Sequence, residues 1–364
     1  MKIRKSLLVV AMSAASLTSS LYAAEFKAGD TDFNIGGYVK FDASYNNFEY
    51  TGNGTIVKIS DLRNGNSDDD DNLDMSARES RFWLKTSTLI NGSTLKTHIE
   101  GDFYGSGGNE IVSNSHGLRL RHAYGEMDGL LMGQTWTTFM DLAHLGEIID
   151  FGQHKSTIFV RQAQVRYTMP FGNSKVMLAA ENPQTGTTDT GSMPDLIARY
   201  DYNSDGFHGS AAMMLRQLKS STGDTETAAA VSLTSKVKIG KTDDIRMQLN
   251  GGALGRYMGL IHPATEGSGS TFDTVNSFGA SLAYRHLWNK DVRSTLMYSA
   301  TQADANIITA TTLDGTQSLH ANVLWDLNKR VRFGAEVQRT NLDFADGSSD
   351  NGLNRIQFSA RYLF

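Results

Sequence analysis

The sequence predicts an all-β protein: a 16-stranded antiparallel transmembrane β-barrel with long outer loops and short periplasmic turns. Apolar and polar residues alternate with a period of two in segment after segment, so each predicted strand has one apolar and one polar face. Long polar connections alternate with short turns along the chain, as they do in outer-membrane barrels. No apolar run approaches the length of about 18 residues that a spanning helix needs, which excludes a helical membrane protein.

The first residues of the chain read as a secretory signal peptide. Lys2, Arg4 and Lys5 precede a short apolar run, Leu7–Leu17, and small residues follow up to Ala24. Cleavage at the end of this stretch would leave a bulky residue three positions back, where a small one is usual, so export is better supported than the cleavage site. We expect residues 1–24 to be the signal peptide and residues 25–364 to form a single barrel domain.

The alternation defines the predicted strands in order. In the first strand, Phe33, Ile35 and Val39 share one face while Lys40 and Asp42 share the other. The segments are Phe33–Tyr45, Glu79–Ile90, Leu95–Phe103, three strands between Gly117 and Tyr167, Lys175–Glu181, Leu196–Tyr202, Phe207–Leu215, Ala229–Val237, Ile245–Tyr257, Phe278–Tyr284, Val292–Ala300, Leu319–Leu327, Val331–Val337 and Ile356–Phe364. All 4 prolines fall between these segments, as expected because proline breaks a strand ladder.

The connections between the predicted strands alternate in length. The long ones are predicted at residues 46–78, 104–116, 137–157, 182–194, 219–225, 258–271, 302–316 and 341–351. Short turns such as Asn91-Gly92 and Asp128-Gly129 separate them. The chain ends on Phe364 in an alternating strand, which is similar to the terminal strand by which the barrel assembly machinery recognises such proteins. We therefore expect that machinery and the lipid of the Gram-negative outer membrane as partners.

The charged face of the barrel must line the lumen, because an Arg or Lys at the lipid midplane costs roughly 2 to 4 kcal/mol. This places inside the basic residues Lys40, Arg81, Lys85, Lys96, Arg119, Arg121, Arg166, Lys175, Arg199, Arg216, Arg246, Arg285, Arg293, Arg332 and Arg355. The acidic residues placed there are fewer: Asp42, Glu100, Asp102, Glu181, Asp201, Asp326 and Glu336. A barrel of this size leaves an aqueous channel, and a basic lining enriches anions. The sequence predicts a passive pore that prefers small anionic solutes.

Other partners and groups are not expected. The formal net charge of −5 argues against nucleic acid as a partner. The acidic run Asp68–Asp71 is expected to be a solvated outer loop, because the spacing of an EF-hand loop is absent. A calcium site is the alternative. The sequence predicts no cofactor, no bound metal and no catalytic residue.

Three residues depart from the alternation. His122 and Glu126 share the parity of Leu118 and Leu120, so either a bulge follows Arg121 or a neighbouring subunit covers that wall. Arg161 has outward parity on its strand. We expect it above the membrane, where the long connection re-enters the wall.

Several stretches of the chain resemble the DcaP-like porin family of Gram-negative outer membranes. They include SRFWLKTSTLINGSTLKTHIEGDFYG, LRLRHAYGEM, LLMGQTWTTFMDLA and IFVRQAQVRYTMPFG, which lie between Ser80 and Gly172. The resemblance implies a homotrimer of 16-stranded barrels whose third outer loop, here Thr137–Thr157, folds into the lumen. It also implies a basic constriction that favours small organic anions such as aromatic dicarboxylates.

The resemblance also suggests roles for particular residues. Arg119 and Arg121 of LRLR and Arg161 of FVRQ correspond to constriction arginines, joined by Arg81, Lys85, Arg166 and Arg199 of the predicted basic lining. Asp141, Glu147 and Asp150 of the third loop would form an acidic rim facing the arginines, with a transverse field between them. The alternative is that these acids and arginines pair and hold the loop in place.

Two other classes of protein are alternatives for such a sequence. Some outer-membrane barrels are hydrolases, but the sequence has no Gly-x-Ser-x-Gly elbow and no His-Glu-x-x-His pair. A soluble exported β-propeller would show internal repeats, and none is apparent. The pore is therefore the preferred interpretation.

Overall fold

The computed structural model describes residues 23–47, 71–109, 113–183, 191–220, 222–259, 261–267, 269, 272–304, 313–345 and 349–364. Its strands are β1 (Ala24–Ala28), β2 (Thr31–Asn46), β3 (Asn72–Ser76), β4 (Arg81–Ile90), β5 (Ser93–Asn109), β6 (Ser115–Met127), β7 (Leu130–Trp136), β8 (Arg161–Phe171), β9 (Ser174–Glu181), β10 (Asp195–Ser204), β11 (Phe207–Lys219), β12 (Thr225–Ile239), β13 (Asp243–Gly252), β14 (Thr265–Glu266), β15 (Asp273–Thr274), β16 (Asn276–Leu287), β17 (Val292–Asp304), β18 (Leu313–Asp326), β19 (Val331–Phe344) and β20 (Ser349–Leu363). A short 3₁₀ helix, η2 (Gly255–Met258), follows β13. Within these ranges, no helix is long and apolar enough to cross a membrane.

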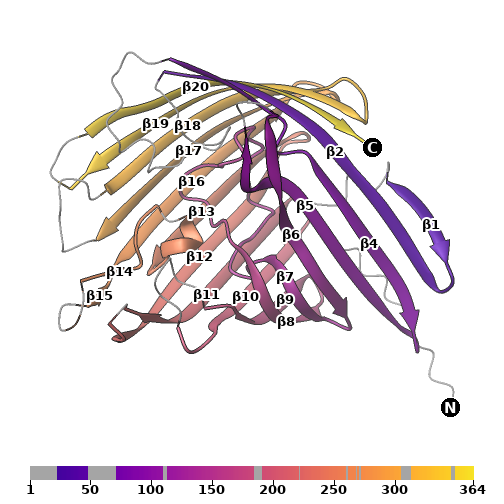
Figure 1. The fold of residues 1–364 in the computed structure, drawn as a ribbon, viewed down its shortest axis with the longest axis horizontal. Coiled ribbons are helices and arrows are strands. Elements are labelled where there is room, and N and C mark those ends of the chain that lie inside the picture. Colours follow the sequence, from indigo (N-terminus) through magenta and orange to yellow (C-terminus); the bar gives the residue numbers. More distant parts are fainter. Residues whose placement is uncertain are drawn as a thin grey trace.

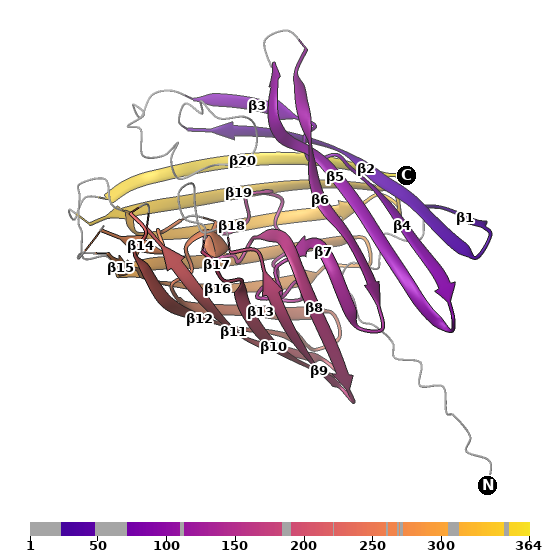
Figure 2. The same cartoon turned by 60° about the horizontal axis from the view of Figure 1, so that its bottom comes forward.

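The strands form one closed antiparallel ring, as the sequence predicts. Of the 18 strands in the main sheet of the described chain, β1 and β3 pair with parts of β2, and the other 16 form the ring. Each strand pairs with the next, and β20 closes the ring on β2 through Tyr38–Asn46. Figures 1 and 2 show the strands following one another side by side around this wall. Closure leaves no unpaired strand edge along the wall, which a membrane requires.

The two faces of the wall differ as the alternation predicts. In β10, Asp195, Ile197, Arg199 and Asp201 are buried while the residues between them are exposed. The exposed residues on this and neighbouring strands are mostly apolar, whereas most charged residues face the inside of the ring. The outward face is the one suited to lipid, because burying a charge there costs free energy.

A β-bulge in β6 accounts for the parity of His122. Glu100 of β5 pairs with His122 and the next residue, Gly101, pairs with Leu120, so Arg121 is an extra residue in β6. Arg121 and His122 are consequently both buried on the inner side, and later inward residues of β6 follow the shifted parity. The freed carbonyl of Leu120 accepts a hydrogen bond from the Gln134 side chain at 3.2 Å. Of the two explanations for His122 and Glu126, the bulge is confirmed.

Two predicted boundaries are wrong. The connection expected at 104–116 is largely strand, because β5 and β6 continue pairing through two register shifts, and their hairpin rises beyond the rim of the ring (Figure 2). The strand expected to end at Tyr257 ends at Gly252, whose φ of +112° turns the chain inward. The acidic run lies outside the described residues apart from Asp71, as does the signal peptide apart from its last two positions.

The orientation of the wall predicts how arginine substitutions behave. Leu233 lies in the middle of β12 and is 53% exposed, whereas Phe207 is the first residue of β11. We expect Leu233→Arg to lower the free energy of unfolding in liposomes by about 2 to 4 kcal/mol and Phe207→Arg by about 0 to 1 kcal/mol. Urea titration of the liposome-folded variants measures both. Equal losses at the two positions would contradict an outward apolar band.

Candidate functional site

The connection between β7 and β8, Thr137–Val160, crosses the inside of the ring and is here named the inner loop. Its backbone carbonyls accept hydrogen bonds from inward-facing side chains on three separated strands. Arg199 of β10 donates to Met140, Asn250 of β13 donates to Ser156 at 2.9 Å, and Asn322 of β18 donates to Glu147 at 2.7 Å. Because these strands are far apart around the ring, the inner loop lies against the lumen side of the wall.

Asp141 anchors the first part of the inner loop. Its carboxylate accepts a hydrogen bond from Arg199 Nη2 at 3.0 Å and one from Thr234 Oγ1 at 2.7 Å, and it lies 3.0 Å from His208 Nε2. Burial disfavours its ionised form, but the hydrogen bond to His208 and the charge of Arg199 outweigh this and hold the pKa of Asp141 well below its usual range. A buried carboxylate with three partners is held firmly in place.

The other two acids of the inner loop also face basic residues of the wall. Glu147 lies between Arg285 and Arg293, and against the effect of burial these two guanidiniums lower its pKa. Asp150 is fully buried, with its carboxylate 3.5 Å from Arg355 Nη1. The three acids expected to form a rim facing the arginines are thus each paired with a basic residue, and Asp141 and Asp150 are buried. This arrangement matches the alternative, in which acids and arginines pair and hold the loop in place.

Glu336 of β19 fixes the middle of the inner loop. Its carboxylate accepts hydrogen bonds from the backbone N–H groups of Ile149 at 2.7 Å and Asp150 at 3.2 Å. It also accepts one from Asn322 Nδ2 at 2.9 Å and lies 3.2 Å from His320 Nδ1. Displacing the loop would leave this buried carboxylate with fewer hydrogen bonds, which costs free energy. Glu336 therefore resists displacement of the loop.

An arginine cluster lies on β4, β5 and β6. Arg81, Arg119 and Arg121 share two carboxylates, those of Glu100 and Asp102 on β5. The separations are 3.4 Å from Arg81 to Glu100, 2.7 Å from Arg119 to Asp102, and 2.7 and 2.8 Å from Arg121 to the two acids. Three guanidiniums therefore face two carboxylates on this part of the wall.

Arg161 joins this cluster, contrary to its parity. Its guanidinium lies 4.4 Å from the centre of the Trp136 ring, which Arg121 also approaches, at 5.9 Å. The charges of Arg121, Arg119 and Arg81 all act on it. Its parity on β8 is outward, yet its guanidinium reaches the Trp136 ring beside Arg121; that Arg161 stands above the membrane stays a prediction. One of its guanidinium nitrogens, Nη1, is buried without a hydrogen-bond partner.

The remaining predicted basic residues have different surroundings. Arg166 faces inward on β8, near Glu126 and Arg199, and its Nε has no hydrogen-bond partner. Lys85 lies 5.4 Å from the Trp83 ring on β4. Neither forms an ion pair with a described residue. Arg199 is instead occupied by Asp141 and by Asp201 on its own strand, so it serves to hold the inner loop.

Aromatic side chains that the sequence reasoning missed support the cluster. Phe151 stacks on Tyr104 at 4.5 Å between ring centres and lies beneath Arg119 and Arg121. Phe159 meets Trp136 edge-on at 5.1 Å. The sequence alone could have marked these aromatics, because they occur in or beside a connection without strand alternation. Only the folded chain shows that they lie against guanidiniums. Such contacts add attraction and fix the ring-facing orientation of the cations.

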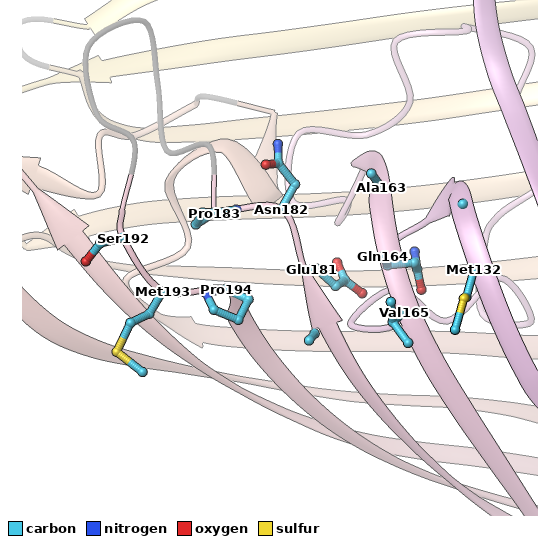
Figure 3. A pocket seen from close by; sticks show the side chains of 12 residues that line it. Met132, Ala163, Gln164, Val165, Glu181, Asn182, Pro183, Ser192, Met193 and Pro194 are labelled. Atoms are coloured by element: carbon cyan, nitrogen blue, oxygen red, sulfur yellow. The ribbon is translucent and has the colours of Figure 1, made fainter.

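The lumen is not the only concave feature of the molecule. A hollow of about 510 Å³ lies at the outer ends of β7, β8 and β9, beside the connection to β10 (Figure 3). Met132, Val165 and Met193 line it and are about half exposed on the outward face. This hollow opens on the outward, lipid-facing side of the wall and not into the charged lumen. Among the described residues, no group of three or more His, Asp or Glu side chains is arranged to hold a metal ion.

Comparison with known proteins identifies relatives of this arrangement. A family model described as DcaP outer membrane protein matches residues 8–364. The outer membrane channel DcaP of Acinetobacter baumannii is similar in structure, with a TM-score of 0.83 and 24% identity over 94% of this chain and 100% of that chain. No curated protein matches the chain.

More distant solved structures share the fold. An anion-selective porin from Comamonas acidovorans has a TM-score of 0.61 and 13% identity over 92% of this chain and 100% of that chain. The trimer form of OmpT from Vibrio cholerae has a TM-score of 0.62 and 12% identity over the same shares, 92% and 100%. At such identities the likeness shows the fold alone.

Two buried histidines make the hold on the inner loop dependent on pH. Burial lowers the pKa of His144 to about 4 although Asp141 opposes the shift, and burial lowers the pKa of His154 well below its usual range. Both are neutral in the docked loop, while released histidines would titrate near about 6.5. Docking is therefore strongest above that pH and weakens as the pH falls through it, by about 20-fold between pH 7 and pH 5 for a histidine whose pKa is about 4. The depressed pKa of Asp141 keeps its own contribution intact over this range.

We expect hydrogen exchange in the inner loop, corrected for intrinsic rates, to speed up between pH 7 and pH 5. The double variant His144→Gln, His154→Gln should lose most of this dependence, whereas the control His286→Gln, on the partly exposed periplasmic end of β16, should keep it. An unchanged pH response in the double variant would show that the two histidines do not control docking.

Proposed function

This chain belongs to the DcaP outer membrane protein family, whose members are Gram-negative outer-membrane channels rather than enzymes, and we propose that it lets small hydrophilic anions diffuse passively through its lumen. The observation that carries the anion preference is the composition of the arginine cluster. Four guanidiniums, those of Arg81, Arg119, Arg121 and Arg161, are near the carboxylates of Glu100 and Asp102, and Glu79, which also acts on Arg81, pairs with Lys40. A local excess of positive charge in a water-filled pore attracts anions and repels cations.

The charge balance elsewhere supports placing the preference at this cluster. Asp195 and Asp244, which the alternation did not assign to the lumen, face inward and are paired with arginines. The three acids of the inner loop pair with further arginines. Most of the basic lining is thus neutralised by neighbours. Arg161 and Arg166, which lack ion pairs with described residues, retain uncompensated charge.

We propose that the inner loop narrows the pore beside this cluster. Phe151 of the loop lies beneath Arg119 and Arg121, so a solute passing the loop meets these guanidiniums. Asp141, Glu147 and Asp150 act as anchors of the loop and not as a rim that orients solutes. An Arg guanidinium binds a carboxylate through two parallel hydrogen bonds, each charge-assisted bond contributing about 1.5 to 3 kcal/mol.

Small dicarboxylates are the solutes that this cluster suits best. Arg161 forms no ion pair with a described residue, and Arg119 is about one-third exposed, so we propose that two carboxylates of one solute each bind a guanidinium. The family resemblance points to the same class. Liposome swelling decides the matter: equal rates for a dicarboxylate and a neutral solute of the same size would refute the preference.

Assembly and processing complete the proposal. We propose that residues 1–24 are a signal peptide, that residues 25–364 form the barrel domain, and that three copies associate; the mass of the protein in mild detergent distinguishes one copy from three. Phe364 closes the ring by exchanging two backbone hydrogen bonds with Gly37, at 3.1 and 3.2 Å, and its ring is 52% exposed. An exposed terminal aromatic at the closing seam is available to the assembly machinery.

Charge selectivity tests the function directly. Reversal potentials in a salt gradient across a planar bilayer should show anion preference for the unmodified channel. A charge about 8 Å from the ion path in a water-like medium stabilises an anion and destabilises a cation by about 0.5 kcal/mol each. The two effects add in the permeability ratio, so Arg161→Gln should lower the anion-to-cation ratio about fivefold.

The matched control for this experiment is Lys290→Gln, which removes one positive charge at an exposed periplasmic turn. It should leave the ratio close to that of the unmodified channel. Cation preference in the unmodified channel would overturn the proposal, and equal effects of the two substitutions would remove Arg161 from it.

A further inference from the structure

Part of the inner wall is apolar, although the wall of a water-filled pore is expected to be polar. On β9 to β12, Ala179, Ile197, Met214 and Ala230 are buried on the inward face. They are covered by Phe139, Met140 and Ile158 of the inner loop and by Leu254, Tyr257 and Met258 of the segment after β13. Burying these large side chains removes apolar surface from water and stabilises the arrangement. A small hydrophobic core therefore fills this side of the barrel.

The segment Ala253–Met258, which contains η2, is here named the buttress. Its backbone is fixed by Arg216 of β11, whose Nη1 donates to the carbonyls of Ala253 at 3.0 Å and Leu254 at 3.3 Å. The same guanidinium lies 5.1 Å from the Tyr257 ring. The Arg216 side chain is almost completely buried, so it has no competing contact with solvent.

Tyr257 connects the buttress to both ends of the inner-loop region. Its carbonyl accepts a hydrogen bond from the N–H of Phe159 at 2.9 Å. Its hydroxyl accepts one from Gln162 Nε2 at 2.7 Å and donates one to Asp195 Oδ2 at 2.8 Å. The ring also meets Phe139 edge-on at 5.9 Å. Tyr257 thus contacts the beginning of the loop and the wall through its buried side chain, and the end of the loop through its backbone carbonyl.

The contacts of Tyr257 continue to the arginine cluster. Phe159, which it holds through the backbone, packs edge-on against Trp136 at 5.1 Å and against Phe151 at 5.9 Å. Trp136 and Phe159 both carry Arg161, at 4.4 and 5.6 Å from the ring centres. A shift of Tyr257 therefore shifts the aromatic support of Arg161, which forms no ion pair with a described residue.

We propose that the buttress is a second element of the constriction and that Tyr257 is a positioning residue for charge selectivity. The proposal rests on the proposed anion pore and deepens it. Tyr257 does not touch the solute; it seals the apolar side of the lumen and confines the solute to the side where Arg161, Arg119 and Arg121 lie.

Single-channel recording tests the proposal, because it reports only on channels that have folded and inserted. Tyr257→Ala removes the ring and should raise the conductance. If the guanidinium of Arg161 then relaxes from about 8 to about 12 Å from the ion path, the anion-to-cation ratio falls about twofold. Tyr257→Phe keeps the ring and its edge-on contact with Phe139 and should restore most of both values; the backbone bond to Phe159 is present in both variants.

One control and one second test variant accompany the recording. Tyr298→Ala removes a tyrosine that is 46% exposed on the outward face and should change neither conductance nor selectivity. Met258→Ala creates a smaller void in the same core and provides the same test, in milder form, should Tyr257→Ala not insert. A purely structural role would lower the thermal stability of these variants and leave both electrical values unchanged.

The outcomes separate the two proposals. Unchanged conductance and selectivity in both Tyr257→Ala and Met258→Ala would overturn the role of the buttress. Absence of anion preference in the unmodified channel would overturn the proposed function, while a conductance rise in Tyr257→Ala would still establish that the buttress narrows the pore.

Discussion

Complete pairing of the backbone is the constraint on which the rest of this structure depends. A lipid bilayer offers no hydrogen-bond partner, so a sheet can cross it only as a closed ring. The closure of β20 on β2 meets that condition, and it divides every strand into a lipid face and a lumen face. Polar and charged side chains must then gather inside, where they compete for one another and for the backbone of the inner loop.

That competition explains why a lumen rich in arginine has so few uncompensated charges. Asp141, Glu147 and Asp150 are used to fasten the inner loop to arginines of the wall, and Glu100 and Asp102 neutralise most of the cluster on β4 to β6. Under the proposed function, anion preference rests on inward basic residues without an ion pair to a described residue, such as Arg161 and Arg166. The apolar core under the buttress has the complementary effect, because it removes one side of the lumen from the solute path.

The sequence predicts the fold well because side-chain alternation is a local property. Leu196 and Arg199 reveal their faces from their own positions in β10. The bulge at Arg121 is harder to predict from the sequence, because an extra residue can be recognised only from the pairing with the neighbouring strand β5. The ion pair of Asp141 and Arg199 joins residues 58 positions apart, and its existence depends on where the loop folds. The alternation even continues through Gly252 to Tyr257, so only the positive φ of Gly252 reveals that Tyr257 belongs to the lumen.

The measurement that bears most directly on this account is a cross-link between the inner loop and the wall. The chain has no cysteine, and a Cβ placed on Gly279 of β16 lies 3.0 Å from Cβ of Ser156, shorter than the separation of about 3.5 to 4.5 Å in disulfides. It also lies 2.8 Å from the sulfur of Met258, so the bond forms with a small shift of the inner loop and of the flexible Met258 side chain. The double variant Ser156→Cys, Gly279→Cys, isolated from the outer membrane, should contain no free thiol and should conduct equally well before and after reduction. Two free thiols in a conducting channel would contradict the placement of the inner loop against the wall.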